Sequence, residues 1–271
     1  MRDSPDFPWH ARGAVEWVAS VLLETRAPGL RHYFLGRNGG QSGGVYGSLN
    51  MAPGRGDDAA NVAANRGLVV KALDLEQEPL SLRQVHGDRI ITVGPGDSSR
   101  LLTAPPEADA YITAQRGVPL MVLTADCLPV FIFDARTPAL GVVHAGWRGL
   151  VLSLPWKAVI TMMDEFGTRP EDCIAVVGPG IARECYEVGE EVRDAFDRSF
   201  PYSSALFSPA REGRWKVDLG EACRLQLRDA LLGPDSIAVC PYCTHCGSGK
   251  FFSARRDGID SGRQAAVAVL S

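Results

Sequence analysis

The middle of the chain reads Pro119-Leu-Met-Val-Leu-Thr-Ala-Asp-Cys-Leu-Pro-Val-Phe-Ile-Phe133 and, after a polar turn, continues as Leu140-Gly-Val-Val143. The stretch contains apolar runs with the length of strands, and continuous runs without alternation are typical of strands buried on both faces. The polar turn at residues 134–138 predicts a hairpin between the second and third runs. This part of the sequence therefore predicts the centre of a buried sheet.

The register of this hairpin decides which side chains meet at its open end. If Asp134 stands opposite Leu140, Val130 stands opposite His144. Cys127 then lies a few residues from His144 at the same edge of the sheet. We expect the thiol and the imidazole to be neighbours.

Segments on both sides of this core alternate between helical and strand patterns. Apolar residues recur at helical spacing, with capping or charged residues around them, in residues 56–73, 155–166, 190–196 and 219–232. Strand patterns occupy residues 33–35, 80–86, 90–93, 173–177 and 236–239, which places His86 at a strand end. We therefore predict an α+β (mixed α/β) fold, in which residues 1–271 form a single domain: a layered sandwich of mixed sheets flanked by helices.

The composition excludes several classes of protein. Of the 271 residues, 45% are hydrophobic and 22% are charged, which is typical of a soluble globular chain and rules out disorder. The formal net charge of −4 argues against a general binder of nucleic acid or anionic membranes. The first ten residues lack the pattern of a secretory signal, and no apolar run approaches the roughly 18 residues of a membrane span. We expect a cytoplasmic protein, and its oligomeric state stays open.

The chain holds seven cysteines, an odd number that makes a full disulfide framework improbable without a secretory signal. Four potential soft ligands, Cys240, Cys243, His245 and Cys246, lie within seven residues. This spacing resembles half of a structural zinc site, but no cysteine or histidine follows Cys246 to complete it. The alternative is a group of buried or exposed thiols without a ligand.

A second set of candidate ligands consists of His86, Cys127 and His144, each at the end of an apolar run. Two imidazoles and one thiolate could hold zinc with a fourth position open to water or substrate, as in catalytic zinc sites. Residue types alone also allow a plain structural role, in which His86 caps a strand and His144 forms a hydrogen bond in the core.

Several motifs occur in an order that resembles the YfiH-like laccase-domain family, which was first called multicopper polyphenol oxidase and is now described as purine nucleoside phosphorylase. They are Gln84-Val-His-Gly-Asp88, Ala108-Asp-Ala110, Thr124-Ala-Asp-Cys-Leu-Pro-Val130, His144-Ala-Gly-Trp-Arg-Gly149, Gly178-Pro-Gly-Ile181 with Tyr186-Glu-Val-Gly189, and Phe251-Phe-Ser-Ala-Arg-Arg-Asp-Gly258. The resemblance runs from about Phe34 to about Arg263.

The resemblance implies a zinc ion held by His86, Cys127 and His144, which would then be the catalytic residues. It also implies phosphorolysis of adenosine, inosine and methylthioadenosine by phosphate, together with deamination of adenosine. Asp126 could orient a ligand or transfer a proton, or it could satisfy backbone N–H groups at the bend. Two arginines are candidate phosphate partners, because a guanidinium can bind two oxygens at once. They are Arg148 and Arg37, and Arg37 lies in a glycine-rich loop at residues 36–44.

Three other functions stay open. The family has been linked to editing of peptidoglycan precursors, which would make the chain an amide hydrolase with Cys127 as nucleophile or ligand. A copper polyphenol oxidase needs several copper sites, and the five histidines of the chain argue against it. A protein that only binds partners, with its zinc closed by a fourth protein ligand, is the non-enzymatic alternative.

Overall fold

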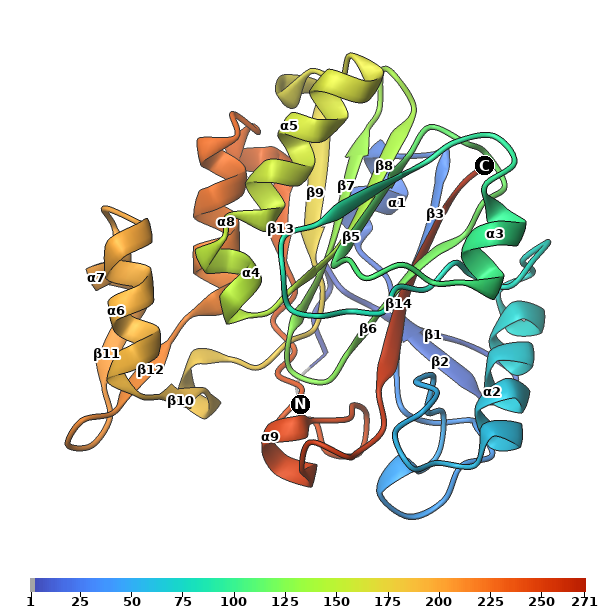
Figure 1. The fold of residues 1–271 in the computed structure, drawn as a ribbon, viewed down its shortest axis with the longest axis horizontal. Coiled ribbons are helices and arrows are strands. Elements are labelled where there is room, and N and C mark those ends of the chain that lie inside the picture. Colours follow the sequence, from blue (N-terminus) through green and yellow to red (C-terminus); the bar gives the residue numbers. More distant parts are fainter. Residues whose placement is uncertain (1–2) are drawn as a thin grey trace.

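A computed structural model describes residues 3–271 of the chain. Two β-sheets pack face to face at its centre, and helices cover the outer face of each sheet (Figure 1). The arrangement confirms the predicted α+β class, with mixed and antiparallel sheets flanked by helices.

The larger sheet contains the apolar stretch from the middle of the chain. Its order is β13-β9-β7-β8-β5-β4. The strands span Ile237–Val239 (β13), Cys173–Val177 (β9), Leu128–Asp134 (β7), Ala139–Ala145 (β8), Ala110–Thr113 (β5) and Ile90–Val93 (β4). The β13–β9 and β4–β5 pairs are parallel and the other pairs are antiparallel. Every residue of β7 and β8 is buried, as their continuous apolar runs predict.

The β7–β8 hairpin forms, but its register differs from the predicted one by one residue. Asp134 pairs with Ala139, and His144 pairs with Pro129. The predicted pairings of Asp134 with Leu140 and of Val130 with His144 are therefore wrong. The thiol and the imidazole nevertheless meet at the same end of the hairpin, because Cys127 lies two residues before Pro129, the partner of His144, and residues two apart along a strand point to the same face.

The shifted register has its cause in the turn. Oδ1 of Asp134 accepts hydrogen bonds from the N–H groups of Arg136, at 2.8 Å, and Thr137, at 3.0 Å. An aspartate that binds the backbone two and three residues ahead closes a tight turn. The connection is thereby shortened by one residue relative to the prediction.

The second sheet is antiparallel throughout and has the order β1-β2-β3-β14-β6. Its strands are Trp9–Arg12 (β1), Val15–Val18 (β2), Leu30–Leu35 (β3), Gln264–Leu270 (β14) and Leu120–Thr124 (β6). The strand patterns at residues 33–35 and 119–124 are confirmed, whereas β1, β2 and the central strand β14 were not predicted. The core between the sheets includes Phe34 of β3 and Phe131 of β7, whose rings stack at 4.6 Å.

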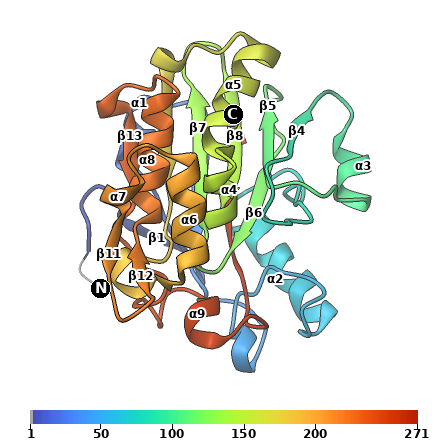
Figure 2. The ribbon, with the colours of Figure 1, turned by 60° about the vertical axis from the view of Figure 1, so that its left-hand side comes forward.

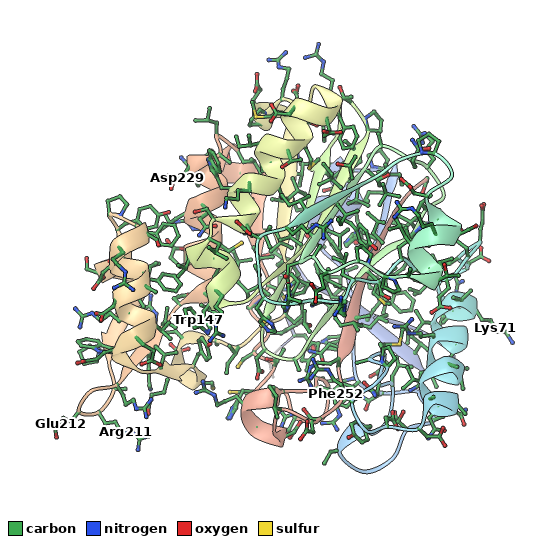
Figure 3. All side chains as sticks on the ribbon, viewed as in Figure 1. Lys71, Trp147, Arg211, Glu212, Asp229 and Phe252 are labelled. Atoms are coloured by element: carbon green, nitrogen blue, oxygen red, sulfur yellow. The ribbon has the colours of Figure 1, made fainter. Side chains whose placement is uncertain are left out.

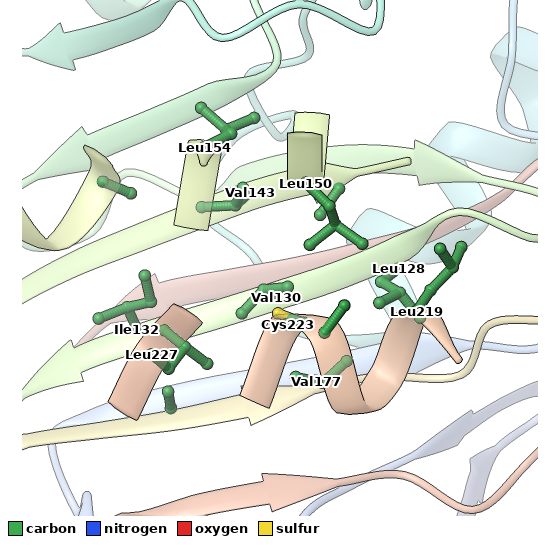
Figure 4. Packing of buried hydrophobic residues seen from close by; sticks show 14 of the residues in the cluster. Leu128, Val130, Ile132, Val143, Leu150, Leu154, Val177, Leu219, Cys223 and Leu227 are labelled. Atoms are coloured by element: carbon green, nitrogen blue, oxygen red, sulfur yellow. The ribbon is translucent and has the colours of Figure 1, made fainter. Parts of the chain in front are cut away.

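Helices close the sandwich on both sides. On the larger sheet lie α4 (Trp147–Val151), α5 (Leu154–Phe166) and α8 (Leu219–Asp229), whose apolar faces pack on β7, β8 and β9 (Figure 4). On the smaller sheet lies α2 (Ala59–Ala72), capped by Asp58. These helices confirm the predicted helical segments at residues 56–73, 155–166 and 219–232.

A small three-stranded sheet stands beside the helical flank. Its order is β10-β12-β11, with strands Glu187–Val188 (β10), Trp215–Val217 (β12) and Phe207–Pro209 (β11). Helix α6 (Glu190–Ser199), which confirms the prediction at residues 190–196, contacts α4, and α7 (Ser203–Leu206) contacts α8 (Figure 2). The other helices are α1 (Val21–Arg26), α3 (Ser98–Thr103) and α9 (Ala254–Asp257).

The segment predicted as a strand at residues 80–86 does not belong to a sheet. It forms only isolated bridges, between Leu80 and Leu120 and between Arg83 and Glu107, so His86 lies in a loop instead of at a strand end. Among residues 3–271, no helix is both long and apolar enough to cross a bilayer.

Candidate metal centre and its cavity

The structure brings His86, Cys127 and His144 together. One ligand atom from each side chain lies within 4.8 Å of the other two, and we refer to these residues as the His-Cys-His trio. The rings of His86 and His144 meet edge to face, with centroids 4.9 Å apart. The three side chains come from the loop before β4, the residue before β7, and β8. They form a compact group of nitrogen and sulfur donors that could hold a metal ion.

Cys127 lies where the chain passes from one sheet to the other, because residues 125–127 connect β6 to β7. Asp126 adopts the left-handed region at this crossing, with φ +95°. Its carboxylate accepts hydrogen bonds from Oγ1 of Thr244 and from the N–H of Arg255, both at 2.7 Å. These bonds hold the crossing in a conformation that is costly for a residue other than glycine, and they fix the position of the neighbouring thiol.

His86 is also held in the left-handed region, with φ +59°. The buried carboxylate of Asp109 accepts hydrogen bonds from the N–H groups of Val85, His86 and Gly87, at 3.2, 3.0 and 2.7 Å. A single carboxylate thus anchors the whole loop that carries the first imidazole.

The same carboxylate orients the second imidazole. Oδ1 of Asp109 lies 2.8 Å from Nδ1 of His144, and neither side chain is more than 3% exposed. With Nδ1 bound to Asp109, Nε2 is left as the ligand atom of His144, which is the usual arrangement for a metal-binding histidine. Sequence reasoning missed this role of Asp109. The only signal was its place in the Ala108-Asp-Ala110 motif.

The electrostatics of the trio favour the thiolate. Burial acts to raise the pKa of Cys127, but the charge of His144 and hydrogen bonds from both histidines lower it to about 6. Burial acts to lower the pKa of His144, while the Cys127 thiolate and the hydrogen bond to Asp109 raise it to about 9. Cys127 is therefore in the ionised form, which binds metals, at neutral pH.

Gly146 leaves room for the trio. A Cβ at this position would lie 2.9 Å from Sγ of Cys127 and 3.2 Å from Cδ2 of His86. A side chain there would push the thiol or the imidazole out of place. The glycine of the His144-Ala-Gly-Trp motif is therefore explained by the close approach of the candidate ligands.

The trio opens into a cavity of about 660 Å³. Its lining includes six arginines, but Asp126 is its only carboxylate; the arginines are Arg55, Arg66, Arg83, Arg148, Arg255 and Arg263. Two of the six are paired with glutamates outside the lining, Arg66 with Glu78 and Arg83 with Glu107, each at 2.7 Å. The other four still give the cavity an excess of positive charge, although the chain as a whole carries a net charge of −4. An excess of guanidinium groups around a concave site is suited to an anionic ligand.

The candidate phosphate partners occupy different places. Arg148 lines the cavity and its guanidinium stacks over Trp147, 4.3 Å from the ring centroid. Trp147 lies at the start of α4 (Figure 3). Arg37 is not part of the lining. Its Nε donates to the carbonyl of Gly47 at 2.8 Å, and its guanidinium lies 4.4 Å from the centroid of Phe252. The structure thus brings Asp126 and Arg148 to the cavity but leaves Arg37 apart from it.

Tyr186 is a cavity residue for which the sequence indicated no role beyond its place in the Tyr186-Glu-Val-Gly189 motif. Burial, followed by the nearby Cys127 thiolate, raises the pKa of Tyr186 to about 12, so its hydroxyl keeps its proton at neutral pH. The guanidinium of Arg255 lies 4.9 Å from the centroid of the tyrosine ring. The cavity thus contains a hydrogen-bond donor beside its arginines.

The donor set fits zinc. Zinc binds imidazole nitrogen and thiolate sulfur, and sites with three protein ligands keep a fourth position for water or substrate. Asp109 binds to His144 and to the His86 loop, so its carboxylate supports the ligands and does not add to them. The arrangement could thus hold one metal ion with an open side toward the cavity.

Comparisons with known proteins place this chain in a family. Residues 31–271 match the family model described as multi-copper polyphenol oxidoreductase laccase. A purine nucleoside phosphorylase of Bacteroides thetaiotaomicron is 35% identical over 240 residues, which cover 86% of this chain and 89% of the relative. Adenosine deaminase RL5, from an unknown prokaryotic organism, is 33% identical over 225 residues, covering 81% and 86%.

The fold is shared along the whole length of a solved relative. The crystal structure of the hypothetical protein YfiH of Bacillus licheniformis matches with a TM-score of 0.90 and 28% sequence identity, covering 99% of this chain and 100% of that one. Because the family model covers nearly all of the sequence and the relatives match over most of their length, the chain belongs to the YfiH-like family of laccase-like domains.

Proposed function

We propose that this protein is a zinc-dependent purine nucleoside phosphorylase that acts on adenosine, inosine and methylthioadenosine, and that it also deaminates adenosine. The observation that carries the proposal is the cavity itself: arginines surround a His-Cys-His trio in a concave site large enough for a nucleoside. A relative named purine nucleoside phosphorylase supports the same reaction.

The trio would hold the zinc ion, and Asp109 would keep the imidazole of His144 in the orientation for binding. A bound zinc ion would supply Lewis acidity at the end of the cavity. The apolar walls, which include Pro53, Leu82 and Leu123, suit the faces of a purine ring.

In phosphorolysis, a phosphate oxygen forms a bond to the anomeric carbon of the ribose while the bond from this carbon to the purine nitrogen breaks. The products are ribose 1-phosphate and the free base, which takes up a proton. We assign phosphate binding to Arg148 and Arg255, because both line the cavity and a guanidinium donates paired hydrogen bonds to phosphate. The protonated hydroxyl of Tyr186 is placed in the same cavity to donate a hydrogen bond.

Deamination uses water in place of phosphate. Water adds to the carbon of adenine that bears the amino group, and ammonia leaves, which converts adenosine to inosine. The relative named adenosine deaminase RL5 favours this second activity. Asp126, the carboxylate of the cavity lining, already accepts hydrogen bonds from Thr244 and Arg255, so we assign it a positioning role beside Cys127.

The test uses purified protein whose metal content has been measured. The protein is incubated with inosine with and without phosphate, and the products are separated by chromatography. From inosine we expect hypoxanthine and ribose 1-phosphate, and only when phosphate is present. When adenosine is offered instead, we expect deamination to give inosine and ammonia. Release of base without phosphate would replace phosphorolysis by hydrolysis.

Two further substrates extend the test to the other candidate functions. A peptidoglycan precursor and a phenol are offered to the same preparation under the same conditions. Cleavage of the precursor amide would assign the trio to an amide hydrolase. Oxidation of the phenol with stoichiometric copper would support the polyphenol oxidase, and either result without phosphorolysis would overturn the proposal.

A further inference from the structure

A second group of potential metal ligands lies outside the cavity. The sulfur atoms of Cys185, Cys243 and Cys246 lie within 4.8 Å of one another, and those of Cys185 and Cys246 are 3.2 Å apart. We refer to these residues as the cysteine cluster. None of them lines the cavity, and all three are free thiols. The cluster therefore has a separate position from the His-Cys-His trio.

The cluster joins two segments that are far apart in the sequence. Cys185 ends a short 3₁₀ helix, Arg183–Cys185, and the other two cysteines lie in the loop between β13 and α9. Gly180 forms a parallel bridge with Cys243, and its carbonyl accepts a hydrogen bond from the N–H of Thr244 at 3.0 Å. The convergence of the sulfur atoms is thus fixed by backbone pairing and does not depend on side-chain rotation alone.

One backbone group already points at the sulfur atoms. The N–H of Ala182 donates to Sγ of Cys243 at 3.3 Å. A hydrogen bond to sulfur stabilises the charged thiolate relative to the thiol, and the thiolate is the form that binds a metal. The N–H of Gly247 donates to the carbonyl of Cys243 at 2.9 Å, which closes the turn that brings Cys246 back toward its partners.

Three thiolates as close together as these sulfur atoms would also repel one another. Like charges at this distance cannot all form unless a cation compensates them. Binding of a metal ion would offset the repulsion and release protons, as it does in thiolate sites generally.

We propose that Cys185, Cys243 and Cys246 form a second metal site that binds a soft divalent ion of the zinc class. Zinc–sulfur bonds of about 2.3 Å in a tetrahedron place the sulfur atoms about 3.8 Å apart. The separation of 3.2 Å between the sulfur atoms of Cys185 and Cys246 and the upper limit of 4.8 Å for all three pairs bracket this value. Cys246 is exposed, so the fourth position faces solvent and is open to water.

The cluster includes two of the four potential ligands in the cysteine-rich motif at residues 240–246 and excludes the other two. Cys243 and Cys246, which have two residues between them, supply a pair of ligands, and Cys185 supplies the third from upstream. Cys240 is buried among apolar residues beneath the motif and is not in the group, nor is His245. Cys240 therefore serves as a matched control from the same stretch of chain.

The position of the cluster suggests what the ion would do. Cys185 directly precedes Tyr186, whose side chain lines the cavity. Thr244, next to Cys243, binds the carboxylate of Asp126 beside the trio. An ion in the cluster would tie these two segments together, in the manner of a structural zinc site, and would stabilise one wall of the cavity.

The experiment measures metal content in the full chain. Wild type, Cys185→Ser, Cys246→Ser and the control Cys240→Ala are loaded with Zn²⁺, freed of loosely bound ion, and analysed for metal per chain. We expect about two equivalents in the wild type and the control, and about one in the two cluster variants. The equivalent that stays in the variants also shows that they have folded.

Co²⁺ provides an independent readout of the ligands. Cobalt bound to thiolates absorbs in the near ultraviolet with an intensity that grows with the number of Co–S bonds. We expect this band to be several times stronger in the wild type and in Cys240→Ala than in Cys246→Ser, where Cys185 and Cys243 alone no longer hold cobalt and only the thiolate of the trio stays bound to it.

Two results would overturn the proposal. The first is a wild type that binds about one equivalent, retained in Cys246→Ser and lost in Cys127→Ala. The second is a non-reduced protein whose mass is lower by two hydrogen atoms, with a peptide that links Cys185 to Cys246. That product would identify a disulfide, which requires an oxidant and excludes the thiolate site.

Discussion

The His-Cys-His trio and the cysteine cluster both gather three potential metal ligands from distant parts of the chain, yet their surroundings differ. The trio faces an arginine-lined cavity and is supported by the buried carboxylate of Asp109. The cysteine cluster lies outside that cavity and is supported by backbone pairing between two loops. We infer that the surroundings of the ligands, more than the ligand types, distinguish the proposed catalytic site from the proposed structural site.

The largest effect is expected when the trio loses its sulfur. Cys127→Ala removes one of three ligands, so we expect loss of the metal ion that the trio would hold. Phosphorolysis should fall by about 10³-fold, corresponding to several kcal/mol of transition-state stabilisation. Metal analysis and rate measurements on the same sample check this. Full activity after loss of the metal would show that the trio does not act through a metal ion.

The next largest effect is expected when the trio loses the carboxylate of Asp109 that supports it. Asp109→Asn keeps the shape but removes the charge that holds His144 and the His86 loop. We expect metal affinity to fall by up to about 100-fold, as for other outer partners of metal-binding histidines. Competition with a chelator of known affinity measures this. An unchanged affinity would contradict the orienting role of Asp109.

The space reserved for the trio can be tested with a pair of glycines from one motif. In Gly146→Ala the new Cβ lies 2.9 Å from Sγ of Cys127, whereas at Gly149 the nearest atoms are 3.6 Å away. Overpacking by one methyl group costs about 2 kcal/mol, so we expect about a 30-fold loss of metal affinity in Gly146→Ala only. Equal losses in both variants would indicate a general packing effect.

The charge of the cavity should act on phosphate and leave the metal unaffected. Arg148→Ala is expected to raise the KM for phosphate about tenfold with normal metal content, because one charged hydrogen-bond donor is lost. Arg224→Ala on α8, where the arginine pairs with Glu221, is the control. Steady-state kinetics at varied phosphate concentration measure the KM in both variants. A KM that stays constant in Arg148→Ala would move the phosphate site elsewhere.

The smallest effect on catalysis is expected from the cysteine cluster. Cys246→Ser should keep activity within about twofold, because the bridge between Gly180 and Cys243 still holds the segments. In Zn²⁺ at about 100 times the dissociation constant, loss of this site removes about 2.7 kcal/mol and lowers Tm by about 5 °C. Thermal unfolding with and without Zn²⁺ measures the change. Equal Tm shifts on addition of Zn²⁺ in the variant and the wild type would contradict a stabilising ion.

Some of the fold follows from local sequence. The apolar runs of β7 and β8 could be predicted because strands buried on both faces need no polar alternation. The central strand β14 was missed because its position between β3 and β6 depends on partners more than 100 residues away. The predicted hairpin register was wrong by one residue because the carboxylate of Asp134 accepts two backbone hydrogen bonds that shorten the turn.

The candidate sites show the same limit. The members of the trio could be proposed from residue types and from the family resemblance, and the structure brings them together. The role of Asp109 could not be predicted from the sequence, because a carboxylate that binds three backbone N–H groups and an imidazole has no sequence pattern of its own. The spacing of Cys240, Cys243 and Cys246 predicts further ligands downstream, whereas Cys185 lies upstream and is brought near by the pairing of Gly180 with Cys243.

The central claim is that the trio serves chemistry and the cysteine cluster serves stability. It is tested most directly by measuring metal content and phosphate-dependent release of hypoxanthine on the same preparations of Cys127→Ala and Cys246→Ser. We predict that each variant loses about one metal equivalent, and that only Cys127→Ala loses phosphorolysis. Loss of activity in Cys246→Ser with full activity in Cys127→Ala would contradict the account.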